Sequence, residues 1–292
     1  MQLASSTTGE IANTSAAVSA PVGVFDSGVG GLSVLQHIRR QLPHESLLYF
    51  ADAGFAPYGD KPEAVIVQRS LAIAEFLLAQ GVKALVVACN TATAAAIAAI
   101  RQAHPSLIVV GVEPGLKPAI ALSKSGIVGV LATSGTLQSQ KFIALREQLS
   151  QQNKTVFLEQ ACIGLADQIE KGELHSPATT LLIQRHVAPL LAGGADTLVL
   201  GCTHYPFVLP LIQQVIGQLG KPADEIGIID TGDAVARQLA RLLAKQNILN
   251  PAPGAGSLNT YTTGSLSSLA NALSSLLKLG NAKDLVQAII LA

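Results

Sequence analysis

Short apolar runs alternate with longer segments of helical periodicity along most of this chain. The runs are apolar at consecutive rather than alternating positions, which is typical of parallel strands covered by helices on both faces. Helical patterns lie between many of them, for example at 63–79, 91–103 and 139–150. This alternation predicts an α/β fold with open parallel sheets. The predicted strands are 22–25, 47–50, 84–88, 107–112, 127–131, 155–159, 197–201, 226–230 and 259–263.

Part of this pattern is repeated. GVKALVVAC at 81–89 aligns without gaps on GADTLVLGC at 194–202, and VGVFDS at 22–27 aligns on VGVLAT at 128–133. Chance is the alternative explanation, because apolar strands often look alike. Two aligned cysteines among only three argue against chance. The repeat predicts two similar open parallel-sheet α/β domains related by a pseudo-two-fold axis, with the active site between them.

The domain boundaries are predicted from local composition. Residues 1–20 are rich in Ser, Thr and Ala and carry one charge, Glu10, so we expect a disordered leader. The segment 112–119 contains two prolines and a glycine and is a candidate crossing between domains, with the return near 220–225. The first domain is then predicted to comprise 21–116 and 227–292, and the second 117–226.

Composition excludes several functional classes. Hydrophobic residues make up 49% of the chain, the formal net charge is zero, and no basic stripe with interleaved aromatics is present, which argues against a nucleic-acid partner. The leader lacks the basic start and apolar core of a signal peptide, and no apolar run is long enough to cross a bilayer. Three cysteines without CxxC spacing suggest neither a disulfide framework nor a zinc site. We therefore expect a cytoplasmic protein without a membrane or metal partner.

The loop after the first predicted strand has the features of an anion site. FDSGVGGLSVL at 25–35 contains Gly28, Gly30 and Gly31 and leads into a helix. Backbone N–H groups at a helix N-terminus favour an anion such as a carboxylate. A dinucleotide site is the alternative, but the GxGxxG spacing is not matched. A tight turn would explain the glycines but not the preceding Asp-Ser pair.

Cys89 and Cys202 follow the two repeated strands. We expect Asn90 and Thr91 to cap the helix after Cys89, and expect its N–H groups and dipole to lower the thiol pKa below about 8.5. We expect Cys202 to lie at an equivalent helix start. A buried core cysteine is the usual explanation for an isolated Cys, and we keep it for Cys162.

Other polar residues follow strands and so are expected near the same ligand. His204 could exchange a proton with Cys202, and Asp26 could do so with Cys89. The loop APYGDK at 56–61 and the segment LATSGT at 131–136 lie at strand ends, which places Tyr58, Thr133 and their neighbours at the rim of the ligand site.

Two facing thiols have three possible uses: a disulfide, a metal site or an acid–base pair. A metal would require more His or Cys than the loops contain. Redox exchange requires the sulfurs to touch, whereas inversion of a carbon centre requires a gap that holds one carbon atom. A non-catalytic two-lobed ligand-binding protein would need neither thiol to be reactive.

Six segments together resemble the motifs of the glutamate racemases: VFDSGVGGLSVL, PYGDK, VACNTAT, GVEP, LATSGT and VLGCTHYP. They occur in that family's order from about residue 22 to 264. The resemblance implies cofactor-independent interconversion of L- and D-glutamate, which supplies D-glutamate for peptidoglycan. It also implies a homodimer and, in some members with N-terminal extensions, a cell-wall precursor as activator. A racemase of another acidic amino acid, such as aspartate, is the neighbouring alternative.

The resemblance also assigns roles to individual residues. Cys89 would act on D-glutamate with help from Asp26, and Cys202 would act on L-glutamate with help from His204. Glu170 would be a further catalytic carboxylate, although its segment, CIGLADQIEKG, has Ile163 where the family usually has proline. The substrate-binding residues implied are Asp26, Ser27, Tyr58, Gly59, Asn90, Thr91, Thr133, Thr136, Thr203 and His204.

Overall fold

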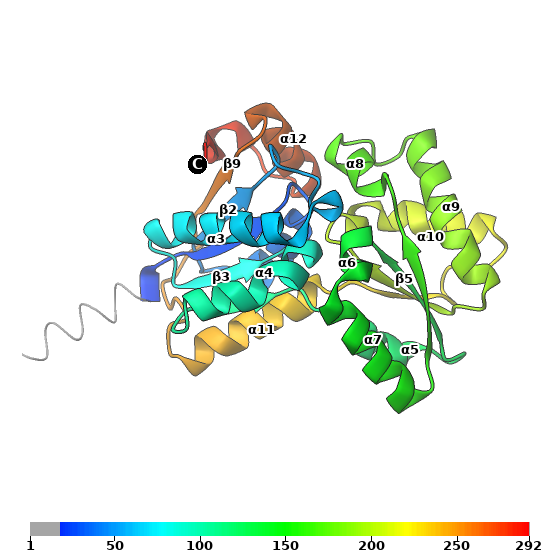
Figure 1. Cartoon of the computed structure of the whole chain (residues 1–292). Coiled ribbons are helices and arrows are strands. Elements are labelled where there is room, and N and C mark those ends of the chain that lie inside the picture. Colours follow the sequence, from blue (N-terminus) through cyan, green and yellow to red (C-terminus); the bar gives the residue numbers. More distant parts are fainter. Residues whose placement is uncertain (1–17, 292) are drawn as a thin grey trace, which may run out of the picture.

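The computed structural model describes residues 18–291 and shows two α/β domains side by side (Figure 1). The predicted leader at 1–20 lies outside the described residues except for positions 18–20. One domain combines the blue-to-cyan part of the chain with the orange and red C-terminal part, and the other is the green-to-yellow middle. Within the described residues, no helix is long and apolar enough to span a membrane.

The first domain contains a six-stranded, fully parallel sheet with the order β10-β9-β2-β1-β3-β4. Alternate residues of each strand enter different cores: Val24 packs with α2, α11 and α12, whereas Phe25 packs with α3 and α4. Both faces are therefore apolar, which explains the continuous apolar runs. The elements are β1 (Val22–Asp26), α2 (Leu32–Gln41), β2 (Leu47–Ala51), α3 (Glu63–Ala79), β3 (Ala84–Val87), α4 (Asn90–Ala103), β4 (Ile108–Gly111), α11 (Gly232–Lys245), β9 (Leu258–Thr262), α12 (Leu266–Leu276) and β10 (Val286–Ala288).

The second domain has a four-stranded parallel sheet with the order β6-β5-β7-β8. Helices α5, α6 and α7 cover one face, and α8, α9 and α10 cover the other. The elements are α5 (Leu116–Leu122), β5 (Ile127–Ala132), α6 (Ser134–Gln138), α7 (Gln140–Asn153), β6 (Val156–Ala161), α8 (Leu165–Glu170), α9 (Pro177–Ala192), β7 (Thr197–Gly201), α10 (Leu209–Gln218) and β8 (Gly227–Ile229).

The predicted pair of similar domains is confirmed by topology and register. The order β2-β1-β3-β4 in the first sheet corresponds to β6-β5-β7-β8 in the second. Val22 pairs with Ala84, and Val128 pairs with Thr197. These are the positions that the two sequence repeats equate, so the repeats describe matched strands of two equivalent sheets. The carboxyl ends of β3 and β7, where Cys89 and Cys202 follow, are therefore structurally equivalent.

The predicted return crossing is misplaced. The boundary was expected between 226 and 227, but β8 pairs with β7 and so belongs to the second sheet. The chain returns to the first domain after β8, through Asp230 and Thr231 into α11. Strand β10 was not predicted, because its three residues, VQA, lack an apolar run.

Candidate active site

Cys89 and Cys202 border one cavity between the two domains, and each side chain is 6% exposed. The cavity measures about 50 Å³, which is room for only a few water molecules beside the thiols. All three cysteines are unpaired. The residues around the cavity are Ser27, Ala56, Pro57, Tyr58, Gly59, Cys89, Asn90, Thr91, Thr133, Ala166, Asp167, Glu170, Cys202, Thr203 and His204.

Cys89 is itself the N-cap of α4, which corrects the expectation that Asn90 and Thr91 would cap this helix. The backbone N–H of Ala92 donates to its sulfur at 3.4 Å, and the sulfur lies 3.7 Å from the hydroxyl of Ser27. Burial, followed by the charge of Asp26, nevertheless raises the pKa of Cys89 to about 12. The expected lowering of this pKa is therefore wrong, because desolvation outweighs the helix N-terminus. Cys89 is a protonated thiol in this environment.

Cys202 lies in a turn rather than at the start of an α-helix, contrary to expectation. A 3-10 helix, Tyr205–Val208, follows it and leads into α10. Its sulfur lies 3.4 Å from Nδ1 of His204, and Nε2 of His204 lies 2.6 Å from Oε1 of Glu170. The cysteine, histidine and glutamate thus form a short chain of contacts on the second domain.

The charges in this chain of contacts support one another. Burial lowers the pKa of His204, but the Cys202 thiolate and Glu170 raise it more, so the net pKa lies well above the ordinary value. Burial raises the pKa of Glu170, but His204 and the N–H of Val29 lower it more, so the net shift is downward. His204 and Glu170 therefore each favour the charged form of the other across a contact of 2.6 Å.

Asp26 lies behind the cavity rather than in its wall. Its side chain is completely buried at the end of β1, where one oxygen accepts the N–H of Gly28 at 2.8 Å and the other accepts the hydroxyl of Thr203 at 3.1 Å. Burial raises its pKa more than the nearby His204 lowers it. Asp26 therefore contacts the second domain directly, whereas its influence on Cys89 is electrostatic.

A cluster of three threonines also joins the domains. The hydroxyl of Thr91 on α4 lies 3.0 Å from that of Thr133 and 3.3 Å from that of Thr136 on the second domain. Thr133 caps α6 and borders the cavity, whereas Thr136 is buried behind it. Thr136 is therefore placed to orient Thr91 and Thr133 rather than to line the cavity.

The loop with Tyr58 is held from the first domain. The Tyr58 hydroxyl donates to Asp52 at 2.6 Å, and Arg69 binds both oxygens of Asp52 at 2.8 Å. Gly59 packs against Thr133 across the domain boundary. Ala56 and Pro57 also border the cavity, and they belong to the same APYGDK motif as Tyr58.

Sequence reasoning missed four of the cavity residues. Ala56 and Pro57 lie beside Tyr58, and Ala166 and Asp167 lie one turn before Glu170 on α8. All four lie in the motifs APYGDK and CIGLADQIEKG, so only their proximity to Tyr58 and Glu170 could have identified them from the sequence. Nothing in their side-chain chemistry distinguished them.

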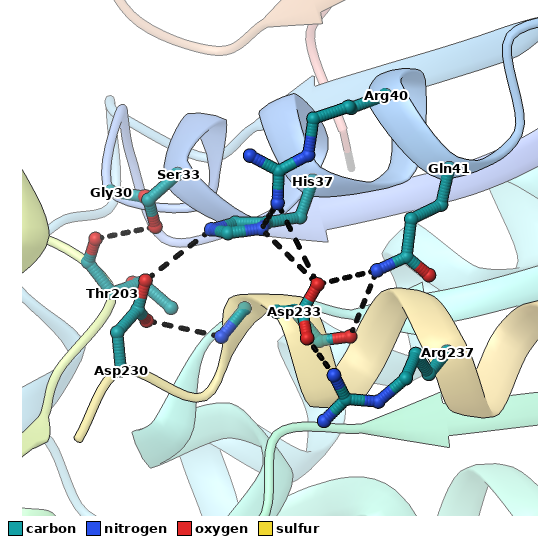
Figure 2. Close-up of polar contacts among 10 residues, drawn as sticks. Gly30, Ser33, His37, Arg40, Gln41, Thr203, Asp230, Asp233 and Arg237 are labelled. Atoms are coloured by element: carbon teal, nitrogen blue, oxygen red, sulfur yellow. Dashed lines mark hydrogen bonds and ion pairs between the residues drawn. The ribbon is translucent and has the colours of Figure 1, made fainter.

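The Gly28–Gly31 loop makes a close contact with the second domain (Figure 2). A Cβ on Gly30 would lie 2.4 Å from Nδ1 of His204 and 2.7 Å from Oγ1 of Thr203. The N–H of Val29 donates to Glu170 at 2.8 Å. The absence of a side chain at Gly30 therefore permits the two domains to close on one another.

Comparison with known proteins identifies close relatives of the chain. A family model described as Asp/Glu/Hydantoin racemase matches residues 22–239. The glutamate racemase of Ectopseudomonas mendocina (strain ymp) is 56% identical over 234 residues, which cover 80% of this chain and 86% of that protein.

The chain is also similar to solved structures of glutamate racemases. Glutamate racemase isoform RacE1 from Bacillus anthracis has a TM-score of 0.80 and 34% identity, covering 93% of this chain and 98% of that one. Glutamate racemase from Escherichia coli, in complex with L-glutamate and the activator UDP-MurNAc-Ala, has a TM-score of 0.76 and 31% identity, covering 94% and 99%.

We predict that Gly30→Ala prevents full closure of the domains, because the added methyl overlaps His204 and Thr203. Iodoacetamide should then label Cys89 and Cys202 at least about tenfold faster than in wild type, as quantified by peptide mass spectrometry. Gly217→Ala is the control, because a Cβ there meets nothing within 4 Å. Equal labelling in the two variants would contradict the close contact.

We predict that Glu170→Gln lowers the free energy of unfolding by about 2 kcal/mol at pH 5–6. The raised pKa of folded His204 means that its contribution is complete below about 6.5 and is lost as pH rises through the folded value. The lowered pKa of folded Glu170 means that its contribution is complete above about 4.5 and is lost as pH falls through the folded value.

The penalty should therefore be greatest between about pH 4.5 and 6.5 and should decline on both sides. Urea unfolding at several pH values measures it. Glu147→Gln is the control, since that side chain is 60% exposed and pairs only at the surface. A penalty that does not change with pH would argue against an ion pair.

Proposed function

Because the chain belongs to the aspartate, glutamate and hydantoin racemase family, we propose that it interconverts L- and D-glutamate by a cofactor-independent two-thiol mechanism. One observation carries the mechanism: two unpaired cysteines, at the ends of equivalent strands, border the same cavity from opposite domains. The glutamate assignment is supported by the relatives, which are named glutamate racemases at up to 56% identity.

The proposed reaction moves one proton at each sulfur. With L-glutamate, the Cys202 thiolate removes the α-proton, so the Cα–H bond breaks and an S–H bond forms. The Cys89 thiol then donates its proton to the opposite face of the carbon, which leaves Cys89 as the thiolate. The raised pKa of Cys89 means that this thiol begins the reaction of L-glutamate with its proton in place, and Nδ1 of His204 lies 3.4 Å from the sulfur of Cys202. D-glutamate reacts by the same steps in reverse.

The carbanion-like transition state of the proposed reaction requires a site that excludes water when the domains close. An amino-acid α-proton is very weakly acidic, so fixed dipoles in a site without water must stabilise the developing charge. Ser27 and the pairs Tyr58-Gly59, Asn90-Thr91 and Thr203-His204, with Thr133, are the proposed ligands for the substrate's carboxylates and ammonium. The cavity is small and enclosed by both domains, so substrate entry requires them to separate and product formation requires closure.

The remaining predicted site residues act from behind the cavity in this proposal. Asp26 holds Thr203 and adds negative charge near Cys89, which favours a protonated Cys89 thiol. Thr136 holds Thr91 and Thr133. Glu170 keeps His204 protonated. Membership of a racemase family means that the chain is an enzyme, which removes the alternative of a non-catalytic ligand-binding protein.

The biological setting follows from the proposed reaction. D-glutamate would be supplied to peptidoglycan synthesis, which places the enzyme in the cytoplasm, where the precursors are made. A homodimer is the proposed assembly. These assignments rest on the relatives and on the motif resemblance.

An activator is also part of the proposal. The Escherichia coli relative was solved with UDP-MurNAc-Ala, and this chain has a cavity of about 420 Å³ at the hinge between its domains. Glu113, Pro114 and Gly115 of the first crossing and Thr231 of the second border it. Three cations, Arg101, Lys117 and Lys141, could bind the diphosphate of a UDP-sugar. An occupant of this cavity would contact both hinge segments at once.

We predict that Cys89→Ser and Cys202→Ser each lower racemisation of glutamate by at least about a thousandfold, because an alcohol is a far weaker acid–base group than a thiol. Circular dichroism at fixed glutamate concentration measures racemisation, and NMR in D₂O measures exchange at the α-carbon. Cys162→Ser is the control, since Cys162 is buried and does not border the cavity.

Undiminished turnover in either cysteine variant would exclude the two-thiol mechanism. Aspartate serves as the competing substrate in the same assay. If kcat/KM is higher for aspartate than for glutamate, the chain is an aspartate racemase rather than a glutamate racemase.

We predict that Lys117→Ala reduces activation by UDP-MurNAc-Ala, because it removes one of the cations at the hinge cavity. The ligand concentration for half-maximal activation should rise at least about fivefold, with the unstimulated rate unchanged. Lys221→Ala, at an exposed site outside this cavity, is the control. If neither wild type nor variant responds to the compound, the activator proposal fails.

A further inference from the structure

Ser33 connects the first domain to the loop that carries Cys202 and His204. It lies on α2, is 4% exposed and is not among the residues that border the cavity. Its hydroxyl lies 2.7 Å from the carbonyl oxygen of Thr203, a residue 170 positions away in the sequence. It also lies 2.9 Å from the carbonyl oxygen of Gly30 (Figure 2).

The hydroxyl of Ser33 has one proton, and it can donate this proton to the carbonyl oxygen of either Thr203 or Gly30. The carbonyl of Gly30 already accepts the backbone N–H of Ser33 at 3.0 Å. Within residues 18–291, the carbonyl of Thr203 has no hydrogen-bond donor other than the Ser33 hydroxyl. A buried carbonyl without a donor is costly, so the proton of Ser33 goes to Thr203.

Thr203 is therefore held by the first domain at two atoms. Asp26 accepts its side-chain hydroxyl, and Ser33 donates to its backbone carbonyl. The carbonyl of Thr203 belongs to the peptide plane that joins Thr203 to His204, so the bond from Ser33 fixes the direction in which His204 leaves the backbone. Because Nδ1 of His204 lies 3.4 Å from the sulfur of Cys202, the contact reaches the Cys202 thiol through His204. Cys89, in contrast, follows β3 of the same domain as Ser33 and does not depend on this contact.

Helix α2 is well anchored for this task (Figure 2). One turn after Ser33, His37 pairs with Asp230 at 3.4 Å, in the segment through which the chain returns from the second domain. Near the end of the helix, Gln41 donates to Asp233 at the start of α11. The hydroxyl of Ser33 is thus presented from a helix fixed to the return crossing.

We propose that Ser33 is a positioning residue that holds the Cys202 half of the site in register with Cys89 when the domains close. This inference rests on the proposed two-thiol reaction and extends it to a residue outside the cavity. It assigns to Ser33 an effect on one thiol only, which separates it from a residue that merely stabilises the fold.

The test is Ser33→Ala, which removes only the hydroxyl. We expect kcat for glutamate to fall on the order of tenfold, with KM changed less than about threefold. Ser70→Ala is the matched control, because Ser70 is a helical serine of the same domain, fully buried, whose hydroxyl has no hydrogen-bond partner among the described residues. It should leave both constants unchanged.

The decisive readout is the isotope effect of α-deuterated glutamate. If the Cys202 step is selectively slowed, the isotope effect should be larger than in wild type when L-glutamate is the substrate, because Cys202 then removes the proton. It should be smaller than in wild type when D-glutamate is the substrate, because Cys89 then removes the proton. Ser33→Thr, which keeps the donor, should restore the wild-type pattern. Equal changes for both enantiomers, or the same loss in Ser70→Ala, would overturn the proposal.

A second measurement does not depend on turnover. The rate of iodoacetamide labelling of Cys202, divided by that of Cys89 in the same molecules, should change at least threefold in Ser33→Ala and not in Ser70→Ala. An unchanged ratio counts against Ser33. If wild type does not racemise glutamate but the ratio changes, the proposed function fails while the positioning contact stands.

Discussion

Burial between the two domains strengthens the electrostatic interactions among the groups of the site. Burial raises the pKa of Cys89 to about 12 and raises that of Asp26, so the first domain favours protonated groups. At the same domain boundary, His204 and Glu170 are 2.6 Å apart and each favours the charged form of the other. The groups on the two sides of the cavity therefore differ electrostatically although their strands are equivalent, and the proposed reaction uses this difference to move a proton from one side of the substrate to the other.

The asymmetry arises from the path of the chain after each of the two equivalent strands. After β3 the chain enters an α-helix at once, so Cys89 becomes an N-cap and receives an N–H from Ala92. After β7 a turn intervenes before the helix, and this turn brings His204 back towards the sulfur of Cys202. A duplicated scaffold thus supplies two thiols at matching positions, and the local backbone gives each a different partner. Such a difference suits a reaction in which one group donates while the other accepts.

Most strands and the two-domain fold could be predicted from the sequence because they depend on apolar runs, glycine loops and the repeat. Eleven of the residues that border the cavity were also named, but the family resemblance supplied Glu170 and the substrate-binding roles, and four bordering residues were missed. The errors have long-range causes. The pKa of Cys89 depends on how deeply it is buried, which its neighbours in the sequence do not encode. Asp26 points to Thr203 rather than into the cavity because the second domain closes over it. Strand β8 was assigned to the wrong domain, because its pairing with β7 depends on the topology of the sheet and not on its own residues. Ser33 lies in the glycine-rich motif at 25–35, but its hydrogen-bond partner, Thr203, is 170 residues away in the sequence.

Hydroxyl groups take part in most of the hydrogen bonds that join the two domains at the site, and this affects how the enzyme can work. Thr91 meets Thr133 and Thr136, and Thr203 meets Asp26 and Ser33. Hydrogen bonds between protein groups contribute only about 0.5–1.5 kcal/mol each, because water replaces them when the site opens. These hydrogen bonds fix the geometry of the site while contributing little free energy of closure. In the proposed reaction, substrate binding can therefore shift the equilibrium towards the closed form, and product can leave by the same path.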